Sequence, residues 1–506
     1  MKKKLLALLA VLSVLVFWSA SVAQGNTTEA ELKAYLDTKE AVFEDISVQM
    51  GVANWNVYSQ EGEADQDTPK RRYCELFSND TLRFVVDTWY GKRETIQDPV
   101  LRRRVEVWRN VLVGARVDMD EEVFKLENKL EALMADTDSM VDKPSQAEMA
   151  TMVLKLMKLR NEKAMALGYA NYAEMILDVT GTGVEWFTHL VDTIEAVTRE
   201  PYRKLLAEIE EEEGKTEIGM PDVMKLIGKA FVTSRGPQIE SERMLPLMKE
   251  TLANIGIDYD AIPVRFVEKA VPYGGNGLAI QIPTDFRIVV NLNMPLSVWM
   301  HELGHGLQGV FTTIEYPILK GYEWCLGNEF SGYMEGMAET NARFARNPGW
   351  LKKYAEFTEE KIAKRKASAQ ALAPVMLRMR LAGCMLEIEY YKDLDQDMQE
   401  LRDKLHKKYL LLDKPSDRPV GLAGNIIYVS YPVYTQNYLI ADMISWQVHS
   451  LLEEKFGKEY VFNKKVGSYF ANHFLADGEL YPWQERLKRA TGKELDVKGY
   501  LRSLGL

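Results

Sequence analysis

The run His301-Glu302-Leu303-Gly304-His305 constrains the fold of this chain more than any other segment. On an α-helix, residues four positions apart lie one turn above each other on the same face, so a helix aims both imidazole rings at one point. The chain has only six histidines in 506 residues. A chance match to this spacing is therefore rare, on the order of one in a hundred. The alternative is a buried helix whose two histidines are simply hydrogen-bonded in the core.

Two short segments before this run have a different pattern. In GLAIQIP (277–283) and FRIVVNLN (286–293), apolar residues alternate with others, which predicts two β-strands. Pro283-Thr284-Asp285 between them favours a hairpin turn. Asn293-Met294-Pro295 then suits the start of a helix. The expected order is strand, turn, strand and the histidine-bearing helix.

Most of the remaining chain has helical periodicity. Apolar residues recur at helical spacing from Val123 to Leu133. Ser145 and Glu148 form the capping-box pattern that opens a long helix. There is no internal repeat or low-complexity linker, and the segments 214–222 and 233–241 are the weak points for a lobe boundary. We therefore predict a mainly α protein with a small β-sheet next to the HExxH helix.

The N-terminus has the three parts of a secretory signal. A lysine-rich start, Met1-Lys2-Lys3-Lys4, precedes an apolar run from Leu5 to Trp18, and small residues follow at Ser21-Val22-Ala23. We predict a signal peptide over 1–23 and a catalytic domain over 24–506, exported to a periplasm or to the cell exterior. An uncleaved membrane anchor is the alternative. No other run is long and apolar enough to span a bilayer.

Composition excludes some partners. The net charge is -11, which argues against nucleic acid, because phosphate binding needs a basic surface. The three cysteines, Cys74, Cys325 and Cys384, contain no C-x-x-C pair, so a sulfur-ligated metal site is not expected. Each cysteine is interpreted as a small buried hydrophobic residue.

The paired histidines suit a zinc ion. Zinc binds nitrogen and carboxylate ligands in a tetrahedron, and a catalytic zinc keeps one position for water. Glu302 lies beside His301 and His305 and can act as the general base for that water. The H-E-x-x-H metallopeptidases use this arrangement of two histidine ligands and a glutamate base, so we predict one zinc ion and hydrolysis of peptides.

The third protein ligand must come from elsewhere in the chain. A metzincin would place glycine and histidine where this chain has Gln308 and Phe311, so that branch is excluded. Glu335 and Glu339 lie one helical turn apart on a later segment, where they would repel each other without a cation. We assign Glu335 to zinc and give Glu339 a hydrogen bond to a ligand histidine. Glu329 is the second choice of ligand.

With these motifs, the chain resembles the gluzincin peptidases. It is most similar to the angiotensin-converting-enzyme family, and next to the thimet oligopeptidase and oligoendopeptidase families. The resemblance rests on five segments: HELGH with YMEGMAE after it, DFRI (285–288), RNEKAMALGYANYAEMIL (160–177), YPVYTQNYLIADMISWQVHSLL (431–452) and WQERLKRATGKEL near the end. It implies a two-lobed helical zincin with a deep cleft that admits short peptides and excludes folded proteins.

The resemblance also implies an oxyanion donor. Tyr438 matches the tyrosine that hydrogen-bonds the tetrahedral oxyanion in these families, and a phenol aimed at developing negative charge is a sound stabiliser. Tyr428, Tyr434 and Ala279 are further candidates for substrate contact. Ala279 is included because a peptide could add to its strand by main-chain hydrogen bonds.

Three departures from the converting-enzyme pattern bear on specificity. Ile426 and Tyr428 stand where those enzymes have the lysine and histidine that contact the substrate, and Asn437 stands where they have the chloride-binding arginine. Chloride activation is therefore not expected. We predict an exported, peptidyl-dipeptidase-like zinc peptidase, with two alternatives: a thimet-type oligoendopeptidase, or a non-catalytic zinc- or peptide-binding protein with the same fold.

Overall fold

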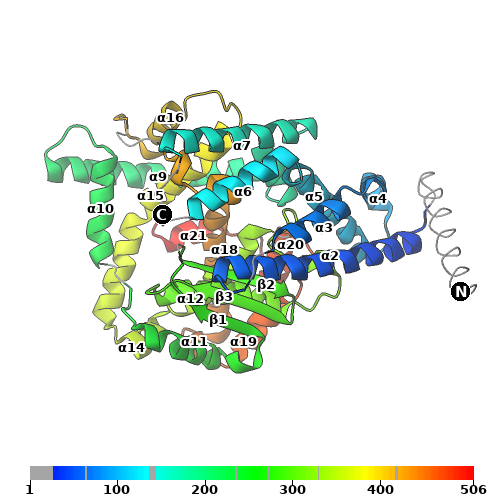
Figure 1. Ribbon diagram of the computed structural model, residues 1–506. Coiled ribbons are helices and arrows are strands. Elements are labelled where there is room, and N and C mark those ends of the chain that lie inside the picture. Colours follow the sequence, from blue (N-terminus) through cyan, green and yellow to red (C-terminus); the bar gives the residue numbers. More distant parts are fainter. Residues whose placement is uncertain are drawn as a thin grey trace, which may run out of the picture.

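Helices form most of the computed structural model, and one three-stranded sheet interrupts them (Figure 1). The structure describes residues 27–62, 65–135, 144–233, 236–271, 273–328, 330–415 and 420–506. The predicted signal peptide and Glu329 lie outside the described residues.

Ten helices of the described chain precede the sheet. They are α2 (Glu29–Ser59), α3 (Asp67–Phe77), α4 (Asp80–Gly91), α5 (Pro99–Asp118), α6 (Glu121–Ala135), α7 (Gln146–Ala166), α8 (Tyr172–Val179), α9 (Val184–Glu213), α10 (Met220–Thr233) and α11 (Ser241–Ile255). The predicted capping box is confirmed at α7, where the Glu148 N–H donates to the Ser145 hydroxyl and the Glu148 carboxylate accepts from the Ser145 N–H. These bonds satisfy backbone groups that the first helical turn leaves free.

The sheet consists of β1 (Val264–Glu268), β2 (Gly275–Gln281) and β3 (Asp285–Val290), in the order β1-β3-β2. Strands β2 and β3 pair antiparallel, which confirms the predicted hairpin. Strand β1 was not expected; it pairs parallel with β3. It was missed because its five residues contain two charges and show no clean alternation.

The helices after the sheet complete the fold. They are α12 (Leu296–Phe311), α13 (Ser331–Phe344), α14 (Pro348–Ala355), α15 (Glu359–Tyr390), α16 (Met398–Leu410), α17 (Ile427–Ser430), α18 (Thr435–Phe456), α19 (Lys465–Phe470), α20 (Trp483–Thr491) and α21 (Val497–Ser503), with one π-helical turn at Ala471–Leu475. Among the described residues, no helix has an apolar stretch sufficient to cross a bilayer.

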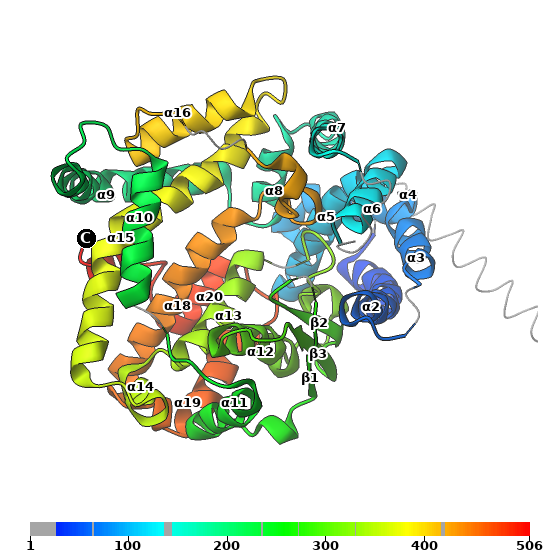
Figure 2. The ribbon, with the colours of Figure 1, turned by 60° about the vertical axis from the view of Figure 1, so that its left-hand side comes forward.

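Helix α13 lies in the centre of the fold, between α12 and α18 (Figure 2). Glycines allow this close packing. A Cβ at Gly304 of α12 would lie 2.5 Å from the Ala338 Cα of α13, and one at Gly336 of α13 would lie 2.9 Å from the Ile444 side chain of α18. Real Cβ atoms do not approach this closely, so the three helices are tightly packed.

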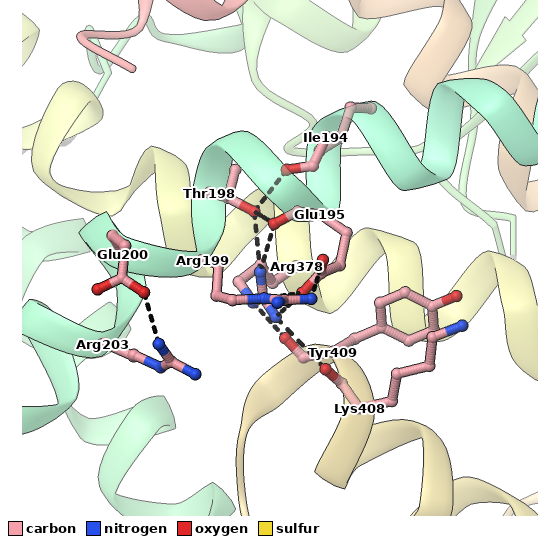
Figure 3. A network of polar contacts seen from close by, with 9 residues as sticks. All are labelled: Ile194, Glu195, Thr198, Arg199, Glu200, Arg203, Arg378, Lys408 and Tyr409. Carbon is pink, nitrogen blue, oxygen red and sulfur yellow. Dashed lines mark hydrogen bonds and ion pairs between the residues drawn. The ribbon is translucent and has the colours of Figure 1, made fainter.

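Buried ion pairs join distant helices. Arg378 of α15 is fully buried, and its guanidinium donates to the Glu195 carboxylate of α9 at 2.9 Å and to the Tyr409 carbonyl of α16 (Figure 3). A buried guanidinium with several acceptors holds its partners in fixed geometry. The three cysteines of the chain are free. Cys325 and Cys384 are buried, as predicted, but Cys74 is only half-buried, so the prediction was wrong there.

Candidate metal centre

Helix α12 carries the histidine pair, and small residues let it pack on both sides. Gly304 faces α13, while a Cβ at Gly309 would lie 2.8 Å from the ring of Phe286 on β3. The helix is therefore held between α13 and the sheet. The rings of His301 and His305 lie on one face, with their centroids 5.0 Å apart, as the four-residue spacing predicts.

The structure brings together the three residues predicted as metal ligands. Ligand atoms of His301, His305 and Glu335 all lie within 4.8 Å of one another. The Glu335 Oε2 atom lies 3.2 Å from the His301 Nε2 atom. Glu335 comes from α13, so the close packing of α12 on α13 places the carboxylate opposite the histidines. Two imidazoles and one carboxylate form the donor set that zinc binds in open sites, so these residues fit the ion.

The electrostatics of the group favour a cation. Burial lowers the pKa of His301, but the carboxylates of Glu335, 3.2 Å away, and Glu339, 3.9 Å away, outweigh burial and raise it to about 10. For Glu335, burial raises the pKa, yet the histidines and a hydrogen bond from Tyr434 bring it below its ordinary value. The carboxylates thus make this position favourable for positive charge.

Glu302 lies beside the group and is 9% exposed. A Cβ at Gly275 of β2 would lie 2.8 Å from the Glu302 Cγ atom, so the bare glycine leaves space for this side chain. Burial raises the pKa of Glu302, opposed by the charges of His305 and His301. A carboxylate with a raised pKa next to a metal group has the properties of a general base.

Two further carboxylates lie behind the histidines. The Glu339 Oε2 atom is 3.9 Å from the His301 Nδ1 atom, and Arg346 binds the other oxygen of Glu339 at 2.5 Å. The Glu323 Oε1 atom is 3.4 Å from the His305 Nδ1 atom. Sequence reasoning found Glu339 from its spacing but missed Glu323, which lies in an irregular loop where no periodicity marks it. Each acid lies next to one ring, but the 3.9 Å separation at Glu339 is too long for the predicted hydrogen bond.

The tyrosines near the start of α18 differ in their contacts and in their exposure to solvent. The Tyr434 hydroxyl donates to the Glu335 Oε1 atom at 2.7 Å. Tyr438 is 40% exposed, and its ring lies 5.5 Å from that of Tyr434. Tyr428 is 8% exposed and does not line the cavity described below, so the predicted substrate contact at Tyr428 is not supported. Tyr434 thus contacts the metal group directly, while Tyr438 lines the cavity next to that group.

A cavity of about 260 Å³ opens beside the group. Its lining residues are His301, Glu335, Glu339, Arg346, Arg380, Tyr438, Ala441 and Asp442. Arg380 donates to the Asp442 carboxylate at 2.8 Å and to the Tyr438 carbonyl at 3.0 Å. Two guanidinium groups therefore border the same space as the metal group.

Strand β2 is an edge strand, but helix α2 packs onto it. A Cβ at Gly51 of α2 would lie 2.7 Å from the Ala279 carbonyl oxygen. The predicted docking of a peptide strand at Ala279 is therefore not supported, because α2 occupies the edge there.

Comparison with known proteins finds a family match in the C-terminal part of the chain. Residues 293–506 match the model of peptidase family M3. Oligopeptidase A of Escherichia coli (strain K12) is 23% identical over 223 residues, which cover 41% of this chain and 31% of that protein. Oligopeptidase A of Salmonella typhimurium is 22% identical with the same coverage. The match spans about a third of the length of these relatives.

Solved structures resemble nearly the whole chain. PZ peptidase A with an inhibitor has a TM-score of 0.68 at 15% identity, over 97% of this chain and 96% of that one. Trypanosoma cruzi metallocarboxypeptidase 1 has a TM-score of 0.62 at 16% identity, over 94% of this chain and 99% of that one. At these identities the likeness shows the fold, and it confirms the predicted helical zincin class.

The comparisons and the site together support a zinc metallopeptidase. The thimet-type family, which sequence reasoning placed second, is the one that the family model supports. The preference for the converting-enzyme family gains no support.

Proposed function

We propose that this chain is an exported zinc peptidase that hydrolyses short peptides. The observation that carries the proposal is the His301-His305-Glu335 group with Glu302 buried beside it. The family match of residues 293–506 supports the same chemistry.

The chain's own residues supply the proton transfers. A bound zinc ion would be held by His301, His305 and Glu335, polarise the peptide carbonyl and lower the pKa of water to about 7. Glu302 takes a proton from the attacking water and passes it to the leaving amine. Tyr438, exposed at the cavity, donates to the oxyanion as the carbonyl becomes tetrahedral.

The cavity bears on where the peptide is cut. Ile426 and Tyr428 stand where converting enzymes have substrate-contacting lysine and histidine, yet Arg346 and Arg380 border the metal group here. An arginine can bind a free C-terminal carboxylate with two parallel hydrogen bonds. These arginines support peptidyl-dipeptidase-like cleavage, whereas the family M3 match supports internal cleavage by an oligoendopeptidase.

One experiment decides between these functions. The chain from Gln24 is loaded with zinc and incubated with pairs of peptides that share a sequence but end in a free acid or an amide. Products are identified by mass spectrometry with and without chelator. Dipeptides released only from free acids support the dipeptidase, and internal cuts indifferent to amidation support the oligoendopeptidase. Zinc binding without any chelator-sensitive cut overturns the proposal in favour of a binding protein.

Export rests on the leader over 1–23 alone. Expression of the whole chain in a bacterial host, followed by fractionation and N-terminal sequencing, should give a mature chain that starts near Gln24 outside the cytoplasm.

A further inference from the structure

Helices α12 and α13 carry the whole candidate metal group between them. His301 and His305 come from α12, and Glu335 comes from α13, which lies beside it (Figure 2). The group therefore forms only if the two helices meet at one particular position along their lengths. A slide of one helix by a single residue would move the Glu335 carboxylate by about 1.5 Å relative to the histidines.

Three residues of α13 meet α12 at a spacing of three. Glu335, Ala338 and Asn341 are all buried, and residues three apart lie on the same side of a helix. The Glu335 Oε2 atom lies 3.2 Å from the His301 Nε2 atom, and Ala338 packs against Gly304. Asn341 makes the third contact with α12.

Asn341 provides a directional bond between the two helices. Its Nδ2 atom donates to the Met300 carbonyl at 2.6 Å, and Met300 directly precedes His301 in the chain. The neighbouring carbonyls on the same side of α12 lie one helical turn away, about 5.4 Å. The bond is therefore available at only one relative position of the two helices.

The rest of this contact contains small residues. Gly304 has no side chain and Ala338 has only a methyl group, so the helices approach closely without interlocking side chains at that point. A Cβ at Gly304 would lie 3.0 Å from the Asn341 Cβ atom, so the asparagine belongs to the same close contact. We expect the small residues to set the distance between the helices and the asparagine to set their position along the helix axis.

The asparagine is an unfavourable residue for the core at this place. It is fully buried, and among the described residues its Oδ1 atom has no hydrogen-bond partner. A buried polar atom without a partner is destabilising, whereas an apolar residue of the same shape has no such atom. In coiled coils, a single buried asparagine likewise lowers stability and fixes the register of the helices.

Other contacts hold the opposite side of α13. The His449 Nε2 atom of α18 lies 2.8 Å from the Thr340 carbonyl, and Arg343 donates to the Ser445 hydroxyl of α18 at 3.0 Å. These contacts fix α13 on α18 and do not involve α12. Loss of the Asn341 bond should therefore change the position of α12 on α13 and leave the packing of α13 on α18 intact.

We propose that Asn341 is a positioning residue, which fixes the register of α12 on α13 and thereby places Glu335 opposite His301 and His305. This inference rests on the proposed zinc peptidase, because it takes these three residues as the metal ligands. It predicts that an apolar replacement of Asn341 disturbs metal coordination without lowering the stability of the protein. Replacement of a residue that only filled the core would lower stability and leave the coordination unchanged.

The test uses Asn341→Leu, which has nearly the same shape but donates no hydrogen bond. The chain from Gln24 is loaded with cobalt(II), whose visible absorption spectrum reports the number and arrangement of its ligands, or with zinc. We expect Asn341→Leu to alter the cobalt spectrum, to release zinc to a chelating dye about 10-fold faster and to lower kcat. Its melting temperature should stay the same or rise, because the unpartnered Oδ1 atom is gone. Asn341→Ala, which also lacks the donor and cannot crowd α12, should alter the spectrum in the same way.

Gln447→Met is the matched control. Gln447 is a buried amide of α18 whose Nε2 atom donates to the Thr491 hydroxyl at 3.0 Å and whose Oε1 atom accepts from the Asp496 N–H at 2.8 Å. Neither bond involves α12 or α13. Its substitution should lower the melting temperature and leave the cobalt spectrum unchanged.

An unchanged cobalt spectrum in both variants of Asn341 would overturn the inference. A large loss of melting temperature in Asn341→Leu would also overturn it, because that loss is the mark of a residue that only fills the core. A wild-type chain that binds cobalt but cuts no peptide would overturn the proposed function, and the spectra would still decide the role of Asn341. A wild-type chain that binds no metal would overturn both.

Discussion

Helix α13 separates two histidine environments that differ in the sign of the charges around them. On its α12 side, His301 and His305 face Glu335, Glu339 and Glu323. On its α18 side, His449 is fully bonded to neutral groups: Tyr460 at its Nδ1 atom, 2.6 Å away, and the Thr340 carbonyl at its Nε2 atom, 2.8 Å away.

The pKa values follow this difference. Acidic neighbours raise the pKa of His301 to about 10 against the effect of burial. Burial, together with the charges of Arg343 and Arg346, lowers the pKa of His449 to about 3. A buried histidine is therefore not by itself a sign of a metal site. The carboxylates that face its ring make the difference.

The largest effect should come from removing a histidine on the α12 side of α13, where acidic residues surround the rings. His305→Ala removes one of three donors, so we expect zinc binding and peptide cleavage to fall below detection. His449→Ala is the matched control, and it should lose stability but keep stoichiometric zinc. Zinc content by atomic emission, together with peptide turnover, measures both, and a zinc-loaded His305→Ala enzyme would contradict the assignment.

Removing only the base should be less severe. Glu302→Gln keeps the volume of the side chain but cannot accept the proton from water, so we expect kcat to fall about 100-fold or more. Zinc content should stay at the wild-type value, because Glu302 is not among the donors. Turnover unchanged in this variant would remove Glu302 as general base.

The acids behind the rings should have smaller effects. Glu339→Gln removes the negative charge that lies 3.9 Å from the His301 ring and should lower zinc affinity by about 10-fold, as should Glu323→Gln for His305. Competition with a zinc chelator measures both affinities. Asp442→Asn, an acid in the same cavity that does not face the histidines, is the control, and an equal loss in this variant would mean that only net charge matters.

The smallest effect should be a change in the stability of the protein caused by His449, on the α18 side of α13. Between about pH 6.5 and pH 3, unfolded chains take up a proton at His449 that the folded protein does not, so stability falls as pH drops through this range. His449→Gln lacks this proton uptake. At pH 7 the variant should be less stable by about 1 kcal/mol, because hydrogen bonds are lost. By about pH 5 the difference should vanish or reverse.

Thermal unfolding of both proteins at several pH values checks this sign. Other titrating groups contribute equally to the two proteins, so the difference isolates His449. A constant difference from pH 7 to about pH 5 would mean that His449 is charged in the folded state.

The local elements could be predicted because their signals are local. The helix under HELGH, the β2–β3 hairpin and the capping box at Ser145 each follow from residues within a few positions of one another. The candidate metal group could be predicted for the same reason. Two of its ligands lie one helical turn apart, and Glu335 and Glu339 repeat that spacing.

The parts that were missed depend on distant contacts. Glu323 was not predicted, and Tyr434 was predicted to contact substrate and not Glu335. Both lie in irregular segments, and only tertiary packing brings them to His305 and Glu335. The same holds for Ala279. The sequence pattern predicts a strand with a free edge there, but α2, more than 200 positions earlier in the chain, covers this edge. Spacing alone cannot report which helix lies on a strand.

We expect the contact between Gly304 and Ala338 to affect the size of the ion that the centre prefers. A Cβ at Gly304 would lie 2.5 Å from the Ala338 Cα atom, so the backbones of α12 and α13 are as close as two helices with only hydrogen at that point can be. Glu335 and both histidines project from these two backbones. We expect their close approach to favour short bonds of about 2.0–2.2 Å, such as zinc forms with nitrogen and carboxylate oxygen. A side chain at position 304 would push the helices apart and shift the preference toward ions of larger radius, such as calcium, whose oxygen bonds are about 2.3–2.6 Å. On this expectation, the choice between metals depends on a residue that has no side chain and is not among the proposed ligands.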